Sequence, residues 1–190
     1  MACIFLISDP HFGQASMLNF KKADGTPLRP FATVEEMDET MASNWNSVVR
    51  PQDKIYCLGD VVMKKQQLDI LKRLNGHKRL VRGNHDIFET KEYMKYFEDI
   101  YGVRVLDDMI LSHIPLHPNS ITKRYNTNVH GHLHSGFVAD KDGLPDGRYF
   151  SVCVEKINFT PISLEDLRIR IKEQKEKYPP IYATDMKGPD

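Results

Sequence analysis

The chain has 190 residues, and its 26 basic and 26 acidic side chains give a net charge of zero at pH 7. This balance provides no overall field that would attract nucleic acid, so nucleic-acid binding would need a local basic patch. Cys3, Cys57 and Cys153 are far apart and odd in number, which argues against a disulfide framework and favours free thiols in a reducing cytoplasm.

The N-terminal segment predicts a buried strand that leads into a polar motif. The first residues lack the basic region of a signal peptide, and residues 3–8 form the short apolar run of a strand buried on both faces. Because no apolar run approaches the ~18 residues of a membrane span, we expect a cytoplasmic protein without membrane contact. Pro10 favours an extended Asp9. Residues i and i+2 of an extended chain share a side, so Asp9 and His11 are expected to converge.

Helices and strands then alternate along the chain. Thr33 and Glu36 form a capping box, and the apolar residues at helical spacing after them predict a helix that ends before Pro51. The next segments are predicted in this order: a strand at 54–58, a helix at 64–74, a strand at 78–82, a helix at 90–98, and strands at 103–106, 109–112, 126–130 and 148–154. The segment 140–147 is rich in Gly, Pro and Asp, which predicts a turn that joins a hairpin.

The C-terminal part of the sequence predicts a helix followed by a tail. Ser163 and Asp166 cap a last helix with one apolar face, and charged and then proline-rich residues follow it. We therefore expect one domain at 1–172 and a C-terminal tail at 173–190. The sequence leaves the oligomeric state open, and a homodimer is one alternative.

Residue types that bind metals follow several of the predicted strands. They are Asp9 and His11, Asp60, Asn84 and His85, His113, and His132 and His134. Sites in such sheets form at the carboxyl ends of strands, so these residues are expected to meet. Oxygen and nitrogen ligands without thiolate suit Mn, Fe, Zn, Ni or Co. The set exceeds what one ion needs, which predicts two divalent transition-metal ions.

The histidine-rich segment at 130–134 is expected to lie at the centre of this site. His132 and His134 are i and i+2, so in an extended chain they would present two imidazoles to one point. Gly131 removes a side chain where the backbone would approach that point. His130 shares their side of the strand, but we expect it to pack within the sheet or to support a ligand.

The order of these motifs, D-x-H, G-D, G-N-H-D, H and G-H-x-H, resembles the calcineurin-like binuclear metallophosphoesterases over residues 3–155. The segment from Ser8 to Gly13 is similar to the small phosphoesterases of bacteria and phages, many of which have His where this chain has Gln14. The resemblance implies an α/β fold, called α+β in some schemes. It would be a β-sandwich of two mixed sheets flanked by helices, with metals at the carboxyl ends of the strands.

The resemblance also implies roles by motif position. The ligands would be Asp9, His11 and His134 for the first ion, Asn84, His113 and His132 for the second, and Asp60 as a bridge between them. His85 would protonate the leaving oxygen after attack by a hydroxide that bridges the metals. Asp86 would support catalysis by orienting an imidazole or by opening the following helix.

The favoured function is hydrolysis of P–O bonds in small phosphodiesters or phosphomonoesters, nucleotides included, with manganese as the first choice of metal. Arg29, His117 and Arg124 are candidate substrate contacts. The Asp-Arg-Gly of protein phosphatases is absent after Gly59-Asp60, which argues against that branch. A nuclease on the same scaffold stays open and would need a basic groove. A non-catalytic scaffold is disfavoured because the Asn-His pair of the third motif is intact.

Overall fold

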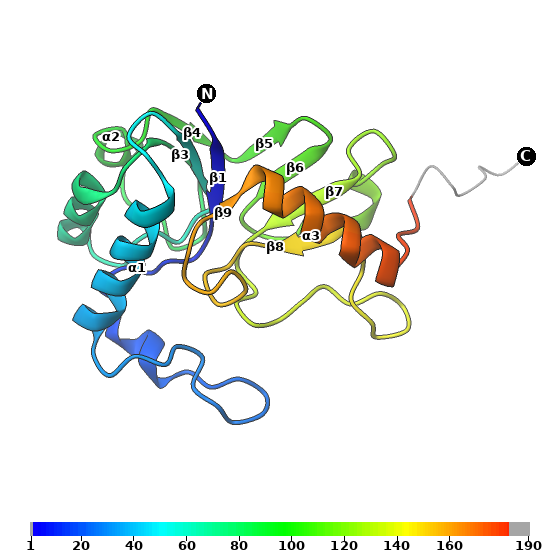
Figure 1. Ribbon diagram of the computed structural model, residues 1–190, viewed down its shortest axis with the longest axis horizontal. Helices are drawn as coiled ribbons and strands as arrows, with labels where there is room; N and C mark the ends of the chain where they lie inside the picture. Colours follow the sequence, from blue (N-terminus) through cyan, green and yellow to red (C-terminus); the bar gives the residue numbers. More distant parts are fainter. Residues whose placement is uncertain (1, 183–190) are drawn as a thin grey trace, which may run out of the picture.

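Two mixed β-sheets flanked by helices form the computed structural model, which describes residues 2–182 (Figure 1). The first sheet has the order β4 (Asp99–Tyr101), β3 (His77–Val81), β2 (Lys54–Cys57), β1 (Ile4–Ile7) and β9 (Ile162–Ser163). The second has the order β5 (Val103–Leu106), β6 (Met109–Ser112), β7 (Thr127–His130) and β8 (Tyr149–Ser151). The predicted fold class is confirmed.

The inner strands of both sheets run parallel, so their carboxyl ends lie at one edge. β1 pairs in parallel with β2, and β2 with β3, while β7 pairs in parallel with both β6 and β8. Among the named strands of residues 2–182, the antiparallel pairs are β9 with β1 and β5 with β6. Each polar motif of the sequence follows one of the parallel strands, which explains how residues far apart in the chain can meet.

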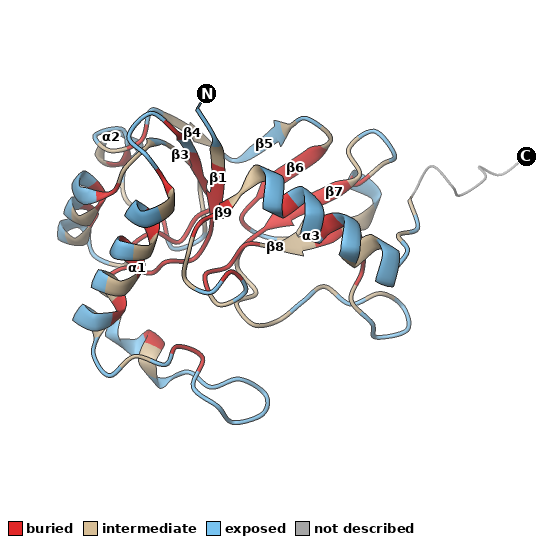
Figure 2. Ribbon diagram, viewed as in Figure 1, coloured by how far each residue is buried: buried red, intermediate tan, exposed pale blue. Residues whose placement is uncertain are grey.

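The helices bury their apolar faces against a core that includes residues of both sheets (Figure 2). α1 (Val34–Val48) begins at Thr33, whose hydroxyl accepts a hydrogen bond from the Glu36 amide as the sequence predicts. Trp45 of α1 is fully buried, and its indole N–H donates to the Asn75 carbonyl. α3 (Leu164–Lys177) begins at Ser163, whose hydroxyl accepts from the Asp166 amide.

Two predicted helices differ in the structure. The expected helix at 64–74 is a 3₁₀-helix, η2 (Lys65–Arg73), and two shorter 3₁₀-helices are η1 (Ala15–Asn19) and η3 (Pro118–Ser120). The inward residues Leu68 and Leu71 are three apart, and a 3₁₀-helix aligns residues at that spacing on one side. The expected helix at 90–98 is only α2 (Thr90–Tyr93), and β4 follows it.

Further corrections concern the C-terminal half. Segment 140–147 forms a turn, and the antiparallel bridge between Ala139 and Pro145 makes it the tip of a short hairpin, but it does not pair β7 with β8 as a hairpin, because these strands are parallel. β9 was not predicted because two residues are too short to show a pattern. α3 continues to Lys177, so the tail expected at 173–190 starts inside a helix, and its residues 183–190 lie outside the described part. Within residues 2–182, no helix is long and apolar enough to cross a membrane.

Candidate metal centre

The predicted ligands meet at the carboxyl edge of the two sheets in two groups. The structure brings Asp9, His11 and His134 together, and beside them Asp60, His113 and His132, with the candidate ligand atoms of each group within 4.8 Å of one another. Asp9, His11 and Asp60 come from the first sheet, and the other three come from the second. Each group therefore joins both sheets, so these residues from distant parts of the chain lie together, while their binding of metal stays a prediction.

The backbone that presents these ligands is left-handed rather than extended. Positive φ angles occur at five of them: Asp9 (57°), His11 (48°), Asp60 (53°), His132 (68°) and His134 (49°). Non-glycine residues held there cost of order 1–3 kcal/mol each and persist where surrounding contacts fix them. The expectation of an extended Asp9 before Pro10 is wrong. So is the expectation that His132 and His134 converge on one point, since they belong to different groups.

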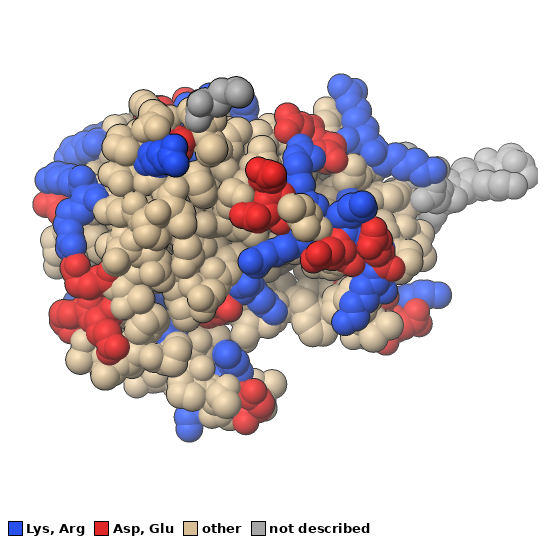
Figure 3. Space-filling view, viewed as in Figure 1, with Lys and Arg blue, Asp and Glu red and all other residues tan. Residues whose placement is uncertain are grey.

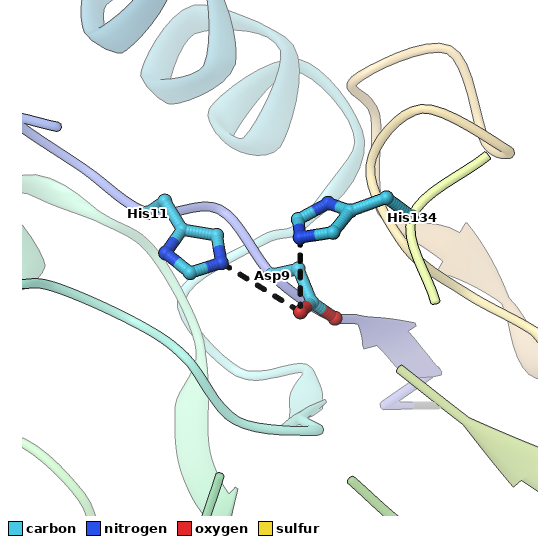
Figure 4. Close-up of side chains that lie close together, drawn as sticks. All are labelled: Asp9, His11 and His134. Atoms are coloured by element: carbon cyan, nitrogen blue, oxygen red, sulfur yellow. Dashed lines mark ion pairs between the residues drawn. The ribbon is translucent and has the colours of Figure 1, made fainter. Parts of the chain in front are cut away.

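The first group places two imidazoles around one carboxylate oxygen (Figure 4). Asp9 Oδ1 lies 3.7 Å from His11 Nε2 and 4.0 Å from His134 Nε2. The other oxygen, Oδ2, accepts hydrogen bonds from the Ser8 hydroxyl at 2.6 Å and the His132 amide at 2.9 Å. Burial alone would raise the pKa of Asp9, but the hydrogen bonds and the nearby histidines lower it overall, so the carboxylate is ionised.

The second group is built around His113. Its Nδ1 lies 2.7 Å from the Leu58 carbonyl, which can only accept, so Nδ1 carries the proton and Nε2 is left for a metal. That Nε2 lies 3.3 Å from Asp60 Oδ2 and 2.9 Å from Asn84 Oδ1. The rings of His113 and His132 are 5.2 Å apart. Asn84 therefore lies with this group, as the sequence predicts.

Asp60 lies between the two groups. Its Oδ2 is 3.3 Å from His113 Nε2 and 3.7 Å from His11 Nε2. Its Oδ1 accepts a hydrogen bond from the His85 amide at 2.8 Å. One oxygen thus faces an imidazole of each group, which is the position that a carboxylate bridging two ions must occupy. Burial raises the pKa of Asp60, but His113 and the hydrogen bond from the His85 amide together hold it below its usual value.

The donor atoms fit divalent cations. Asp9 Oδ1 and both ring nitrogens of His11 are buried without a hydrogen-bond partner among the described residues. Unpaired buried polar atoms are costly, and a coordinated cation would remove that cost. Imidazole and carboxylate ligands, without thiolate, suit first-row transition metals. Residues 2–182 therefore hold two candidate metal sites.

Glu155 and Arg29 support the first group from behind. Glu155 Oε1 lies 3.1 Å from His134 Nδ1, so the carboxylate orients this ring with Nε2 toward Asp9. Arg29 pairs with Glu155 at 2.8 Å and donates to the carbonyls of Asp9 and Pro10 at 2.6 and 2.7 Å. Arg29 is fully buried, so the prediction that it contacts substrate is wrong.

Asp86 connects two of the ligand loops. Its carboxylate accepts from the backbone amides of Asp60, Val61 and Gly83 at 2.9, 3.0 and 2.9 Å. It is buried, and these contacts hold the loop after β2 against the loop after β3. The structure thus corrects the predicted role, because Asp86 positions Asp60 through its backbone and does not orient an imidazole.

The remaining predicted residues lie at the surface or within the sheet. His85 is exposed, and its ring centroid lies 5.7 Å from that of His11. The exposed His117 accepts from the Asn119 amide at the start of η3, and the exposed Arg124 lies over the Tyr125 ring. Their substrate contacts stay predictions. His130 is buried, with Nδ1 at the Gly131 carbonyl and its ring against Tyr149, which confirms packing within the sheet.

Sequence reasoning missed Glu155, although a signal was present. Glu155 directly follows the predicted strand at 148–154, as other ligand residue types follow earlier strands, but it belongs to none of the five motifs of the resemblance. The glycine prediction is confirmed, since a Cβ on Gly131 would lie 2.0 Å from Ser8 Oγ and 2.4 Å from Asp9 Oδ2. The backbone at Gly131 therefore approaches the first group too closely for any side chain.

Comparisons with known proteins agree with this site. The chain matches the calcineurin-like phosphoesterase family over residues 4–181. It is 35% identical to an uncharacterized protein of Methanocaldococcus jannaschii over 92% of this chain and 93% of that protein. It is 27% identical to the gene 66 protein of Mycobacterium phage L5 over 74% of this chain and 82% of that one.

A solved structure shares the fold. A protein of unknown function from Aquifex aeolicus superposes with a TM-score of 0.65 and 26% identity, covering 90% of this chain and 100% of that one. The chain belongs to the calcineurin-like phosphoesterase family, whose members are metal-dependent hydrolases of phosphoric esters.

Proposed function

We propose that this chain is a binuclear phosphoesterase that hydrolyses a P–O bond of small phosphate monoesters or diesters, with His85 as the general acid. The observation that carries the proposal is the position of Asp60, with Oδ2 3.7 Å from His11 Nε2 in one group and 3.3 Å from His113 Nε2 in the other. When bound, two divalent ions, for which manganese is our first choice, would activate water and stabilise the entering and leaving oxygens.

The placement of His85 supports its role in proton transfer. Its backbone amide donates to Asp60 Oδ1, so the residue is fixed to the carboxylate between the two groups. Its side chain is exposed beside His11 and is therefore accessible to a substrate that binds over the metals. A proton from the His85 imidazole to the leaving oxygen would typically contribute ~10²–10⁴-fold to the rate.

The surface favours a small substrate over nucleic acid. Arg29, a basic side chain beside the first group, is buried and already paired with Glu155. On the face shown in Figure 3, basic side chains are interspersed with acidic ones and form no continuous stripe. A nuclease would need such a stripe to neutralise successive phosphates.

A metal-dependent activity screen tests the proposal. Metal-free protein is supplied with Mn, Ni, Co or Zn and assayed on aryl phosphomonoesters, aryl phosphodiesters, nucleotides, and single-stranded and duplex nucleic acid. We expect hydrolysis of small esters that requires added metal and is lost in Asp60→Asn. Faster cleavage of nucleic acid would favour the nuclease, and inactivity with every metal would refute both enzymes.

A further inference from the structure

Cys153 lies directly behind the first group, although it is not one of the predicted ligands. It is fully buried, and its Sγ lies 3.3 Å from Asp9 Oδ2. The backbone fixes this contact, because the Ser8 amide donates to the Val152 carbonyl at 2.9 Å and the Val154 amide donates to the Ser8 carbonyl at 3.0 Å. Cys153, which follows β8, therefore pairs with Ser8, which follows β1, and its side chain is held beside Asp9.

The thiol must be the donor in this contact. Asp9 is fully buried and ionised, and an ionised carboxylate can only accept hydrogen bonds. Cys153 therefore keeps its proton and directs it at Asp9 Oδ2, its one hydrogen-bond acceptor within residues 2–182. A thiolate, which is the form of cysteine that binds metals, is incompatible with this hydrogen bond.

The two oxygens of Asp9 are in different environments. Oδ2 accepts from three donors, which are the Cys153 thiol, the Ser8 hydroxyl and the His132 amide. Oδ1 has no hydrogen-bond partner among the described residues and faces the rings of His11 and His134 (Figure 4). A carboxylate held in this way offers a single oxygen to an ion that binds between the two imidazoles.

The Ser8 hydroxyl is not committed to Asp9. Its oxygen lies 2.6 Å from Asp9 Oδ2 and 2.7 Å from the Leu58 carbonyl, and it has one proton for these two acceptors. When that proton points to Leu58, the side-chain donor left on Asp9 Oδ2 is the Cys153 thiol. The thiol therefore has the most specific part in fixing the orientation of the carboxylate.

We propose that Cys153 is a positioning residue of the metal centre, whose thiol holds Asp9 Oδ2 so that Oδ1 is the oxygen that binds the first ion. The inference rests on the metal centre of the proposed function but not on its substrate. Cys153 would act through Asp9 and would contact neither ion. Outer partners of a metal ligand are typically worth roughly 10–100-fold in affinity, and a thiol is a weak donor, so we expect the low end of this range.

Cobalt titration of metal-free protein tests the positioning role without any measurement of turnover. Co²⁺ alone is added to the wild type, Cys153→Ala and Cys153→Ser in competition with a chelator, and the visible absorption of the bound cobalt is recorded separately. Cys153→Ala removes the donor, so one ion should bind roughly tenfold more weakly and its absorption bands should shift. Cys153→Ser keeps a hydroxyl donor and should restore most of the wild-type affinity.

Cys57→Ala is the matched control. Cys57 is a second buried cysteine, on β2, so its replacement leaves a similar cavity but removes no hydrogen bond to a predicted ligand. In urea unfolding of metal-free protein both alanine variants should lose stability, whereas only Cys153→Ala should bind cobalt more weakly. If Cys153→Ala fails to fold, Cys153→Val, which fills the volume without a donor, takes its place.

The outcomes separate this inference from the proposed function. Equal cobalt affinity in Cys153→Ala and the wild type, or equal weakening in Cys153→Ser, would overturn the positioning role and leave the phosphoesterase intact. An intense sulfur-to-cobalt charge-transfer band that is lost in Cys153→Ser would also overturn it, because the thiol would then be a ligand. A wild type that shows the expected cobalt affinities but hydrolyses no ester would overturn the proposed function and support the positioning role.

Discussion

At the scale of single residues, the site separates side chains that face the ions from side chains that hold them in place. Asp60 presents an oxygen toward both groups and His113 a ring nitrogen within the second, whereas Glu155 and Arg29 act from behind. The first kind could be named from the motifs, since residue type and strand position identify a ligand. For the second kind, the sequence offers only the position of Glu155 at a strand end, and no local pattern shows that a carboxylate at 155 and a guanidinium at 29 will meet.

The role of His85 leads to a prediction about turnover. His85→Asn removes the proton donor but keeps the backbone amide that binds Asp60, so activity on an aryl phosphodiester should fall by ~10²–10⁴-fold while metal content stays at the wild-type level. His77→Asn is the matched control, because His77 is exposed on β3 and pairs with Glu98 away from the predicted ligands. Unchanged turnover in His85→Asn would show that another group supplies the proton.

The contact between Glu155 and His134 leads to a prediction about metal affinity. Glu155→Gln keeps the shape but removes the charge that orients His134, and such outer partners are typically worth roughly 10–100-fold in affinity. Titration of metal-free protein should therefore show weaker binding of one ion, with the other less affected. Glu165→Gln, on the exposed start of α3, should bind both ions as the wild type does. Equal binding by Glu155→Gln would contradict the positioning role.

At the scale of elements, the sequence predicted the structure best where a strand is buried on both faces or a capped helix buries one face. β1, β2, α1 and the start of α3 follow from apolar runs and capping residues, and the structure agrees. The helical type of η2 and the short edge strand β4 depend on packing against the rest of the fold, which a local pattern does not contain. The left-handed backbone of the ligand loops could not be predicted either. A residue that precedes proline favours an extended conformation, and Asp9 precedes Pro10.

The end of β1 is also held by α1, which gives a prediction about pH. Asp38 of α1 accepts from the Gly13 amide, and burial raises the pKa of its carboxyl to about 6. The folded state then binds more protons than the unfolded state between about pH 4 and 6, so this group's contribution to stability is lost as pH rises through that range. Because the Asn side chain does not titrate, Asp38→Asn should lose less stability than the wild type as pH rises. The difference should be about 1 kcal/mol after allowance for solvent screening.

Urea unfolding of metal-free protein at pH 4.5 and 7.5 measures this effect. The difference in unfolding free energy between Asp38→Asn and the wild type should shift in favour of the variant at the higher pH. Glu165→Gln serves as the control, because it changes an exposed carboxylate and should show no such shift. The same difference at both pH values would mean that Asp38 titrates as an ordinary surface carboxyl.

At the scale of the whole molecule, the metal centre joins the two sheets. The first group combines Asp9 and His11 after β1 with His134 after β7, and the second combines Asp60 after β2 with His113 after β6. Each ion would therefore act as a link between sheets. At a hundredfold excess over its Kd, one bound ion stabilises the folded state by about 2.7 kcal/mol.

Metal removal should accordingly lower the thermal stability of the whole domain. For a protein of this size, 2.7 kcal/mol corresponds to a fall in Tm of roughly 5–10 °C per ion. Calorimetry with and without a chelator measures it, and unfolding should remain a single transition because one core includes both sheets. A Tm that is the same with and without the chelator would be inconsistent with ions that bridge the sheets.

The most direct test of the account is the metal stoichiometry of the wild type and Asp60→Asn after reconstitution with manganese, measured by elemental analysis. The account predicts two ions per wild-type chain and less than one per Asp60→Asn chain, because Asp60 Oδ2 faces both groups. A wild-type chain that holds a single ion, or an Asp60→Asn chain that keeps two, would contradict it.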